Sequence, residues 1–263
     1  MKTLVIIPAR YASTRFPGKP LALLGGRTII ERVWEAVGQT LGVDRVVVAT
    51  DDERICDHIE NIAGEGAAMM TSDRHHSGTD RCGEVVERLA ASGEEYDVVV
   101  NVQGDEPFVE PTQIQTLIDT FVDSRTDIAT LRTPIVDTDE LLSPNNVKVV
   151  CDRSGNALYF SRQPIPYRRD VPVDQWLAGA QYYKHVGLYA FRSHVLAELC
   201  RLEPGTLEDC ERLEQLRWLE NGHRIKVCTT AHANIGIDTP ADLAAAEHQL
   251  AAMQQKKRNK TQQ

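Results

Sequence analysis

The sequence has no long hydrophobic run and no paired-cysteine motif. Its apolar runs are far too short to span a bilayer, and Pro8 and Arg10 interrupt the first of them, unlike the apolar core of a signal peptide. The six cysteines are scattered without a CxxC pair, which favours buried free thiols. From these absences we expect a protein of the cytoplasm that does not contact membranes.

Two common nucleotide-binding motifs are also missing. Neither GxxxxGK[ST] nor GxGxxG occurs, so a P-loop protein and a dinucleotide-binding protein both lose their main support. The chain has 29 basic and 38 acidic residues, a net charge of −9, which argues against a general nucleic-acid-binding role. An acidic protein that binds an anionic substrate needs cations gathered locally, or a metal ion.

Most of the chain alternates short apolar runs with segments of helical period. The apolar or β-branched runs are residues 4–7, 45–49, 67–70, 98–102 and 128–131. The segments between them carry amphipathic stripes, one of which begins with a capping box at Thr28 and Glu31. This pattern predicts an α/β fold with a Rossmann-like, mostly parallel sheet and helices on both faces.

The pattern changes after about residue 145. Two short apolar runs flank a turn at 152–156, which predicts a hairpin, and residues 162–183 have no clear period. We interpret about 145–191 as a small mixed or antiparallel insert, or a dimer-contact subdomain, within a single domain of residues 1–252.

A strand is predicted at residues 184–191, two helices are predicted from Ser193 and Thr206, and a last strand and helix follow them. The last strand is predicted at about residues 233–237, and Thr239, Pro240 and Asp242 form a strong helix start after it. The polar tail, residues 253–263, is expected to be disordered.

A loop rich in cations follows the first predicted strand. Arg10, Arg15 and Lys19 lie there among small and turn-forming residues. Cations at the carboxyl end of a first strand are well placed to bind a polyphosphate. The alternative is a solvated surface loop, since most Arg and Lys side chains are exposed. That alternative does not explain why three cations share one loop directly after a core strand.

Two aspartates occupy corresponding positions elsewhere in the pattern. Asp105 follows the run at 98–102, and Asp238 follows the last predicted strand. The carboxyl ends of parallel strands open on one side of a sheet, where ligands bind. Mg²⁺ takes one or two carboxylates together with phosphate oxygens, so the two aspartates and the cationic loop suit a nucleotide-transfer site. Taken singly, Asp105 could initiate a turn and Asp238 could favour a helix N-terminus.

With these features in place, the sequence resembles the 3-deoxy-manno-octulosonate cytidylyltransferase family, also called CMP-KDO synthetase. The similarity extends along almost the whole chain. The matching blocks are 8–20 (PARYASTRFPGKP), 49–51 (ATD), 77–81 (SGTDR), 101–107 (NVQGDEP), 146–150 (NVKVV), 157–162 (ALYFSR), 184–189 (KHVGLY), 213–217 (LEQLR) and 236–243 (GIDTPADL). Ala12, Phe16 and Asp80 depart from the usual pattern, and none of them removes a charged or metal-binding position of the motif.

The resemblance implies a transferase of lipopolysaccharide biosynthesis. Such an enzyme activates the eight-carbon acid KDO with CTP and gives CMP-KDO and pyrophosphate. The anomeric hydroxyl attacks the α-phosphorus of CTP in line, and Mg²⁺ bridges the α-phosphate and the acid. A second Mg²⁺ on the triphosphate and a homodimer are expected.

The resemblance also assigns roles to individual residues. Arg10 and Lys19 would hold the triphosphate, with Arg15 adding charge nearby; Lys19 would assist departure of pyrophosphate. The metal would be held by Asp105 and Asp238. The residues implied at the nucleotide are Ser77, Gly78 and Gln103. Those implied at the acid are Gln103, Arg162, His185, Tyr189, Glu214, Gln215 and Arg81; as a first-turn helix residue, Arg81 could instead be simply exposed.

Each acid-site residue also has a plainer explanation. His185 could be a structural hydrogen-bond donor, Arg162 could pair with Asp170, and Glu214 and Gln215 could be solvated helix positions. At the level of function, the nearest alternative is a cytidylyltransferase that activates sialic-type acids. A sugar-1-phosphate nucleotidyltransferase and a non-catalytic nucleotide sensor are further alternatives.

Overall fold

The structure, a computed structural model, describes residues 1–232 and 236–261. It divides into two compact units, each of which gathers segments that are distant in sequence. We call residues 4–93, 101–111 and 236–261 the N-terminal unit, and residues 1–3, 94–100 and 112–232 the middle unit. Each is described by itself.

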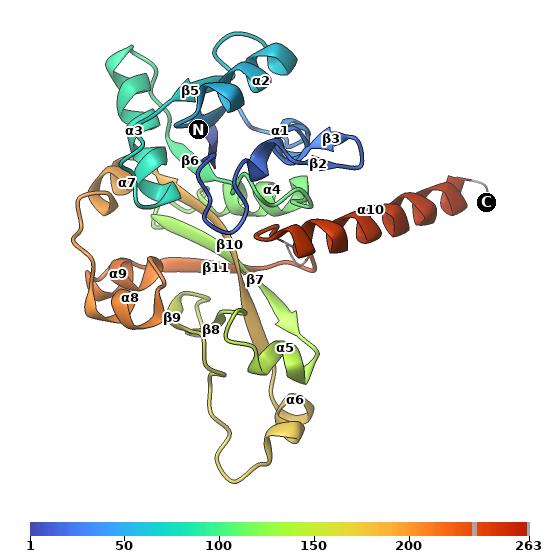
Figure 1. Cartoon of the computed structure of the whole chain (residues 1–263). Helices are drawn as coiled ribbons and strands as arrows, with labels where there is room; N and C mark the ends of the chain where they lie inside the picture. The colour runs from blue at the N-terminus through green and yellow to red at the C-terminus, as the bar shows by residue number, and fades with distance from the viewer. Residues whose placement is uncertain (233–235, 262–263) are drawn as a thin grey trace. The chain divides into compact units, whose positions relative to one another are not determined.

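The N-terminal unit is an α/β layer structure. Its strands are β1 (Thr3–Ala9), β2 (Leu23–Leu24), β3 (Arg27–Thr28), β4 (Arg45–Thr50) and β5 (Ala68–Met70); its helices are η1 (Lys19–Leu21), α1 (Ile29–Gly38), α2 (Glu53–Ala63), α3 (Gly78–Ala91) and α10 (Pro240–Thr261) (Figure 1). Strands β1, β4 and β5 pair in parallel, with Ile6 opposite Val47 and Ala49 opposite Met69.

Burial explains why these segments form strands and helices. Every residue of β1 is buried, as expected for a strand covered on both faces. Helix α1 buries one apolar face and begins at Thr28, whose hydroxyl accepts a hydrogen bond from the Glu31 amide. These features confirm the strand and the helix start that the sequence predicts.

Helix α10 departs from the expectation of a disordered tail. It begins at Pro240, the predicted helix start, where the side chains of Thr239 and Asp242 each accept a hydrogen bond from the other's amide, and it runs to Thr261. Lys, Gln and Ala are good helix formers, so the polar end of the chain can continue an established helix. Residues 262–263 of the expected tail lie outside the described residues.

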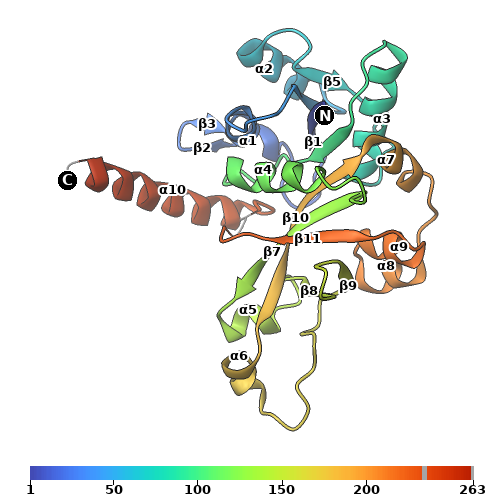
Figure 2. The same cartoon turned by 180° about the vertical axis from the view of Figure 1, so that it is seen from behind.

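The middle unit contains a mixed sheet. Its strands are β6 (Val98–Asn101), β7 (Ile128–Ile135), β8 (Lys148–Cys151), β9 (Ala157–Ser161), β10 (Tyr182–Arg192) and β11 (Ile225–Thr229); its helices are α4 (Pro111–Thr120), α5 (Thr138–Leu142), η2 (Val173–Gln175), α6 (Trp176–Gly179), α7 (Ser193–Leu199), α8 (Thr206–Glu211) and α9 (Gln215–Glu220) (Figure 1, Figure 2). Strand β11 is parallel to β7, and β10 is antiparallel to β7.

The predicted hairpin is present as β8 and β9. The two strands pair antiparallel, and the Asp152 amide donates to the Asn156 carbonyl at 2.8 Å across the turn. The segment that follows packs Trp176 against Tyr182 with the rings stacked at 6.0 Å. The chain is thus an α/β protein with a mostly parallel sheet flanked by helices and a small antiparallel addition, which confirms the expected fold class.

The last predicted strand needs correction. Residues 236 and 237 are not in a strand, and the rest of the prediction, residues 233–235, lies outside the described residues. Among the strands that the sequence analysis missed is β11, which pairs with β7. Within the described part of the chain, no helix combines the length and apolar character needed to cross a membrane.

Candidate active site

The cationic loop leaves β1 and folds back on Tyr11. The Tyr11 carbonyl accepts hydrogen bonds from the amides of Ser13 and Gly18, both at 2.9 Å. Gly18 has a φ of +71°, in the left-handed region, and a Cβ atom there would lie 2.9 Å from the Tyr11 hydroxyl. Gly18 therefore permits both the turn and the close approach of the ring, and the turn delivers the chain to Lys19 at the start of η1.

Lys19 links two carboxylates. Its Nζ atom donates to Oδ2 of Asp105 at 2.6 Å and to Oδ1 of Asp238 at 3.2 Å. Arg15 Nη2 lies 3.0 Å from the other oxygen of Asp238. The two carboxylates are therefore no farther apart than the sum of the two Lys19 distances. The structure brings together one buried ammonium, one exposed guanidinium and two partly exposed carboxylates.

The backbone explains why Asp105 and Asp238 meet. The amide of Ile237 donates to the carbonyl of Asp105 at 3.0 Å. Ile237 is fully buried in a cluster with Leu24 and Ile29, which anchors the residue before Asp238. The amide of Asp238 in turn donates to Asp242 Oδ2 at 3.0 Å in the cap of α10. Asp238 is thus held by a backbone contact and a helix cap, and not by a strand end.

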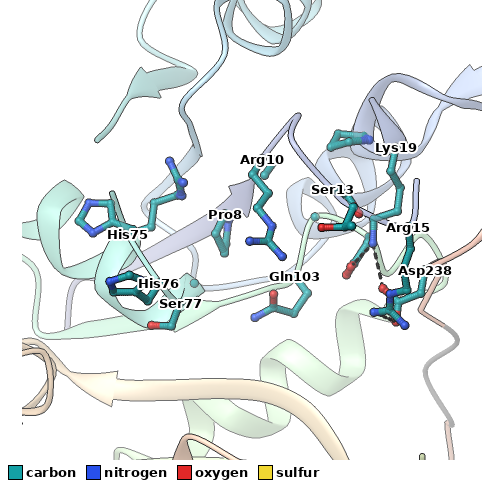
Figure 3. Close-up of a pocket in the computed structure, with 17 residues that line it drawn as sticks. Pro8, Arg10, Ser13, Arg15, Lys19, His75, His76, Ser77, Gln103 and Asp238 are labelled. Atoms are coloured by element: carbon teal, nitrogen blue, oxygen red, sulfur yellow. Dashed lines mark hydrogen bonds and ion pairs between the residues drawn. The ribbon is translucent and has the colours of Figure 1, made fainter. Parts of the chain in front are cut away.

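The opposite side of the cleft is built by the start of α3. Ser77 caps this helix and accepts from the Asp80 amide at 3.1 Å. A Cβ atom on Gly78 would lie 3.1 Å from Pro8 and 3.5 Å from Gln103, so the helix start packs closely on β1. In Figure 3, Arg10 and Gln103 project between Ser77 on one side and Lys19 on the other. The positive end of the helix dipole at Gly78 favours an anion here.

These segments enclose a cleft of about 260 Å³. It is lined by Pro8, Ala9, Arg10, Ser13, Thr14, Arg15, Lys19, Pro20, His75, His76, Ser77, Gly78, Arg81, Gln103, Gly104, Asp105 and Asp238. The lining includes every residue that the sequence analysis associates with the triphosphate, the nucleotide and the metal. Its Arg and Lys side chains outnumber its carboxylates, which suits an anionic ligand such as a polyphosphate.

The Arg81 side chain lines this cleft and holds neighbouring segments together by hydrogen bonds. The side chain is buried and donates to Asp51 Oδ2 at 2.8 Å and to Thr71 Oγ1 at 2.5 Å. Arg81 is therefore not the exposed first-turn residue that was the plainer alternative for it. These contacts join the first turn of α3 to the end of β4.

The sequence analysis assigned no role in the site to several lining residues, including His75 and His76. A ring nitrogen of His75 contacts the Glu84 carboxylate on α3, and Glu84 also accepts from the Ser72 amide at 2.9 Å. Their place directly before Ser77 is the signal that could have revealed them.

Across residues 1–232 and 236–261, no group of three or more His, Cys, Asp or Glu side chains could hold a metal ion.

In the middle unit, the structure groups His185 with Tyr189. Their rings lie 5.4 Å apart, and His185 Nε2 is 3.0 Å from the Thr130 hydroxyl. Burial lowers the pKa of His185 to about 3, so its imidazole is neutral near pH 7. Burial and the nearby Glu214 carboxylate raise the pKa of Tyr189. Its hydroxyl is buried and makes no well-formed hydrogen bond to the described residues.

Arg162 makes contacts that differ from the one considered for it. Its Nε donates to the Glu211 carbonyl at 2.7 Å and its Nη1 to the Pro144 carbonyl at 3.0 Å; Asp170 instead pairs with Arg169. The guanidinium thus fixes the backbone just before Glu214 and Gln215. Gln215 is buried at the start of α9.

Comparison with known proteins shows to which class of protein this chain belongs. The family model described as "Cytidylyltransferase" matches residues 4–225, most of the chain. The chain therefore belongs to the cytidylyltransferase family and is a nucleotidyltransferase. Two solved structures of low identity, 4-diphosphocytidyl-2C-methyl-D-erythritol synthases, share only its fold: one from Anaerococcus prevotii has a TM-score of 0.60 at 18% identity, covering 95% of this chain and 96% of its own, and another has 0.63 at 14%, covering 95% and 98%.

Relatives of higher identity define the particular family. Proteins from Parabacteroides distasonis and Bacteroides thetaiotaomicron, both named 3-deoxy-manno-octulosonate cytidylyltransferase, are 52% identical to this chain; they cover 94% and 95% of it and 97% and 98% of their own lengths. A solved CMP-2-keto-3-deoxy-manno-octonic acid synthetase complexed with CTP is 40% identical, with a TM-score of 0.87, and covers 96% of this chain and 100% of its own. Within the cytidylyltransferases, the chain is a member of the 3-deoxy-manno-octulosonate cytidylyltransferase family.

Proposed function

We propose that this protein transfers the cytidylyl group of CTP to KDO, giving CMP-KDO and pyrophosphate for lipopolysaccharide biosynthesis. The observation that carries the proposal is the arrangement of Lys19 between Asp105 and Asp238 in a cation-lined cleft. The family supports the same activity, since its members carry this substrate in their names and one was solved with CTP.

The chemistry forms one bond and breaks one bond. The anomeric oxygen of KDO bonds to the α-phosphorus of CTP, the bond from that phosphorus to the bridging oxygen of the β-phosphate breaks, and the hydroxyl proton passes to solvent. Arg10, Arg15 and Lys19 hold the triphosphate and neutralise the charge that develops on departing pyrophosphate. Ser77, Gly78 and Gln103 contact the nucleoside.

The two aspartates fit a divalent ion. Carboxylate oxygens are the donors that Mg²⁺ takes in nucleotide-transfer sites, and it typically uses one or two of them together with phosphate oxygens. The ion pairs of the Lys19 ammonium with Asp105 and Asp238 support this proposal, because the two carboxylates already share one cation. When bound, Mg²⁺ would polarise the α-phosphate and the attacking hydroxyl. For the aspartates to hold the metal ion, the Lys19 ammonium would first leave them and bind the phosphates.

We further propose that the acid is recognised in the middle unit. The Tyr189 hydroxyl, buried without a well-formed hydrogen bond to the described residues, lies beside neutral His185 and can donate to a sugar oxygen. Glu214 and Gln215 can accept from sugar hydroxyls. Arg162 keeps the backbone that carries them in place. A cytoplasmic site of action and a homodimer remain predictions; sedimentation of the purified chain tests the second.

A pyrophosphate-release assay tests the function. The chain is given CTP, UTP, ATP or GTP with either KDO or N-acetylneuraminate, in the presence of Mg²⁺. We expect release with CTP and KDO, and little with the other seven combinations. Faster release with N-acetylneuraminate would favour the sialic-type activity, and binding of CTP without release would reduce the protein to a nucleotide sensor.

Single substitutions test the metal site. Asp105→Asn and Asp238→Asn should each lower kcat by about 10²- to 10³-fold, a typical loss for one electrostatic partner of a transition state. Asp57→Asn, which removes an exposed carboxylate of α2 in the same unit, is the matched control and should keep normal turnover. Near-normal turnover in either cleft variant would rule out the proposed metal site.

A further inference from the structure

Arg54 lies in α2, outside the residues that line the cleft, yet it contacts the cationic loop. Its guanidinium carbon is 3.4 Å from the centroid of the Tyr11 ring. A guanidinium at this distance from an aromatic ring makes an attractive cation–π contact. Tyr11 directly follows Arg10, so the contact reaches the loop next to one of its phosphate-facing cations.

The guanidinium is oriented by its own neighbour in sequence. Arg54 Nε and Nη2 donate to the two oxygens of Asp52 at 2.9 and 2.7 Å. Asp52 is also the N-cap of α2 and accepts from the Arg54 amide at 3.0 Å. The paired bonds fix the plane of the guanidinium on the helix start.

The other contacts of Tyr11 carry this restraint into the loop. The Tyr11 side chain packs on Gly18, where a Cβ atom would lie 2.9 Å from the Tyr11 hydroxyl oxygen and 3.0 to 3.1 Å from two ring carbons. The Tyr11 carbonyl also accepts the amides of Ser13 and Gly18. Gly18 immediately precedes Lys19, which binds both aspartates. A continuous series of contacts therefore connects α2 with the ammonium at the centre of the cleft.

We propose that Arg54 is a positioning residue that holds the cationic loop, residues 10–19, in its nucleotide-binding shape through Tyr11. Arg54 does not touch the substrate. It raises the fraction of molecules whose loop is already ordered, so CTP spends less of its binding free energy on ordering it. The effect on CTP rests on the proposed function, whereas the effect on the loop does not.

The chain supplies a matched control. The Arg125 side chain donates to the two carboxylate oxygens of Asp123 at 3.0 and 2.8 Å, and the Arg125 amide donates to Asp123 Oδ1 at 3.0 Å. Arg54 makes the same set of bonds with Asp52. Arg125 lies in the middle unit and has no aromatic ring among its described contacts. Arg54→Met and Arg125→Met thus remove the same kind of ion pair, and only the first removes a contact with the loop.

Two measurements test the proposal. The first is tryptic cleavage of the native chain after Arg15, followed by mass spectrometry. Arg54→Met should raise the rate of this cleavage about two- to fivefold, the effect of losing one exposed cation–π contact on local opening. Arg125→Met should leave the rate unchanged, and Arg54→Lys, which keeps the cation without the planar fork, should lie between.

The second measurement is steady-state turnover. Arg54→Met should raise KM for CTP by about the same two- to fivefold with kcat nearly unchanged. Combining it with Tyr11→Leu should add little to Tyr11→Leu alone, because the two residues act through one contact. Equal effects of Arg54→Met and Arg125→Met, an unchanged cleavage rate, or full additivity would each overturn the proposal. Increased cleavage in a chain that does not use CTP would support the loop restraint and reject the proposed function.

Discussion

Lys19→Met separates the ion pairs that Lys19 makes in the structure from the phosphate-binding role that we propose for it. In the free protein, its ammonium neutralises Asp105 and Asp238, at 2.6 and 3.2 Å. In the proposed reaction, the same ammonium binds the phosphates. Met has nearly the same length and fills the same space without the charge. We therefore expect the variant to bind a divalent ion more tightly in the absence of nucleotide and to turn over more slowly in its presence.

The exposure of the partners sets the magnitude. The Lys19 side chain is 9% exposed, whereas the two aspartates are 33% and 48% exposed. An exposed ion pair stabilises by about 0 to 1 kcal/mol, and breaking a buried one costs about 3 to 5 kcal/mol. Because solvent reaches both aspartates, we place the free energy of the Lys19 ion pairs near the range for exposed pairs, at about 1.4 kcal/mol. That free energy corresponds to a factor of about ten in the affinity of the aspartates for a metal ion.

Titration of the nucleotide-free chain with Mn²⁺, followed by electron paramagnetic resonance, measures this effect. Lys19→Met should lower the Kd for Mn²⁺ about tenfold, because no ammonium competes for the carboxylates. Lys184→Met is the matched control, since it removes a partly buried lysine paired with Glu140 in the other unit and should leave the Kd unchanged. An unchanged or higher Kd in Lys19→Met would refute the idea that the ammonium and the metal share one place.

Two further predictions concern stability. Gly104→Ala places a Cβ atom 2.9 Å from the Pro8 carbonyl and should lower the free energy of unfolding by about 1 to 3 kcal/mol. Gly38→Ala, at the end of α1, meets open space and should raise the free energy of unfolding by up to about 1 kcal/mol. Urea unfolding that ranks the two variants the other way would contradict the packing at Gly104. Because the folded pKa of His185 is about 3, below its ordinary value of 6.5, only the unfolded chain binds this proton between those pH values. The stability linked to His185 is therefore complete above pH 6.5 and decreases as pH falls toward 3, by about 2 kcal/mol from pH 7 to pH 5; His185→Gln should remove this pH dependence and His194→Gln should keep it, and equal slopes in all three proteins would exclude His185 as its source.

The acid-site residues show how far a motif can specify a role. Resemblance assigns Arg162, His185 and Tyr189 to one substrate, and in the structure these side chains make different kinds of contact. Arg162 donates to backbone carbonyls, while the Tyr189 hydroxyl is buried without a well-formed hydrogen bond to the described residues. A motif records which side chains occur together. The partner of each polar atom depends on the backbone that folds around it.

The sequence alone was sufficient for the fold class and for the cationic loop. Both depend on local patterns: apolar runs such as residues 4–7 predict buried strands, and Thr28 and Thr239 mark helix starts through bonds to residues three positions away. The capping signal at Thr239 also located Asp238 correctly before a helix. Local patterns did not reveal β11, whose place is fixed by pairing with β7, far away in the sequence.

Only the tertiary structure decided what the charged residues contact. The meeting of Asp105 and Asp238 depends on one backbone bond from Ile237 and on the burial of Ile237 among Leu24 and Ile29. The neutral state of His185 likewise depends on burial by residues distant in sequence. Sequence patterns carry information about neighbours along the chain, whereas ion pairing and desolvation depend on distances in space, which are set when the whole core packs.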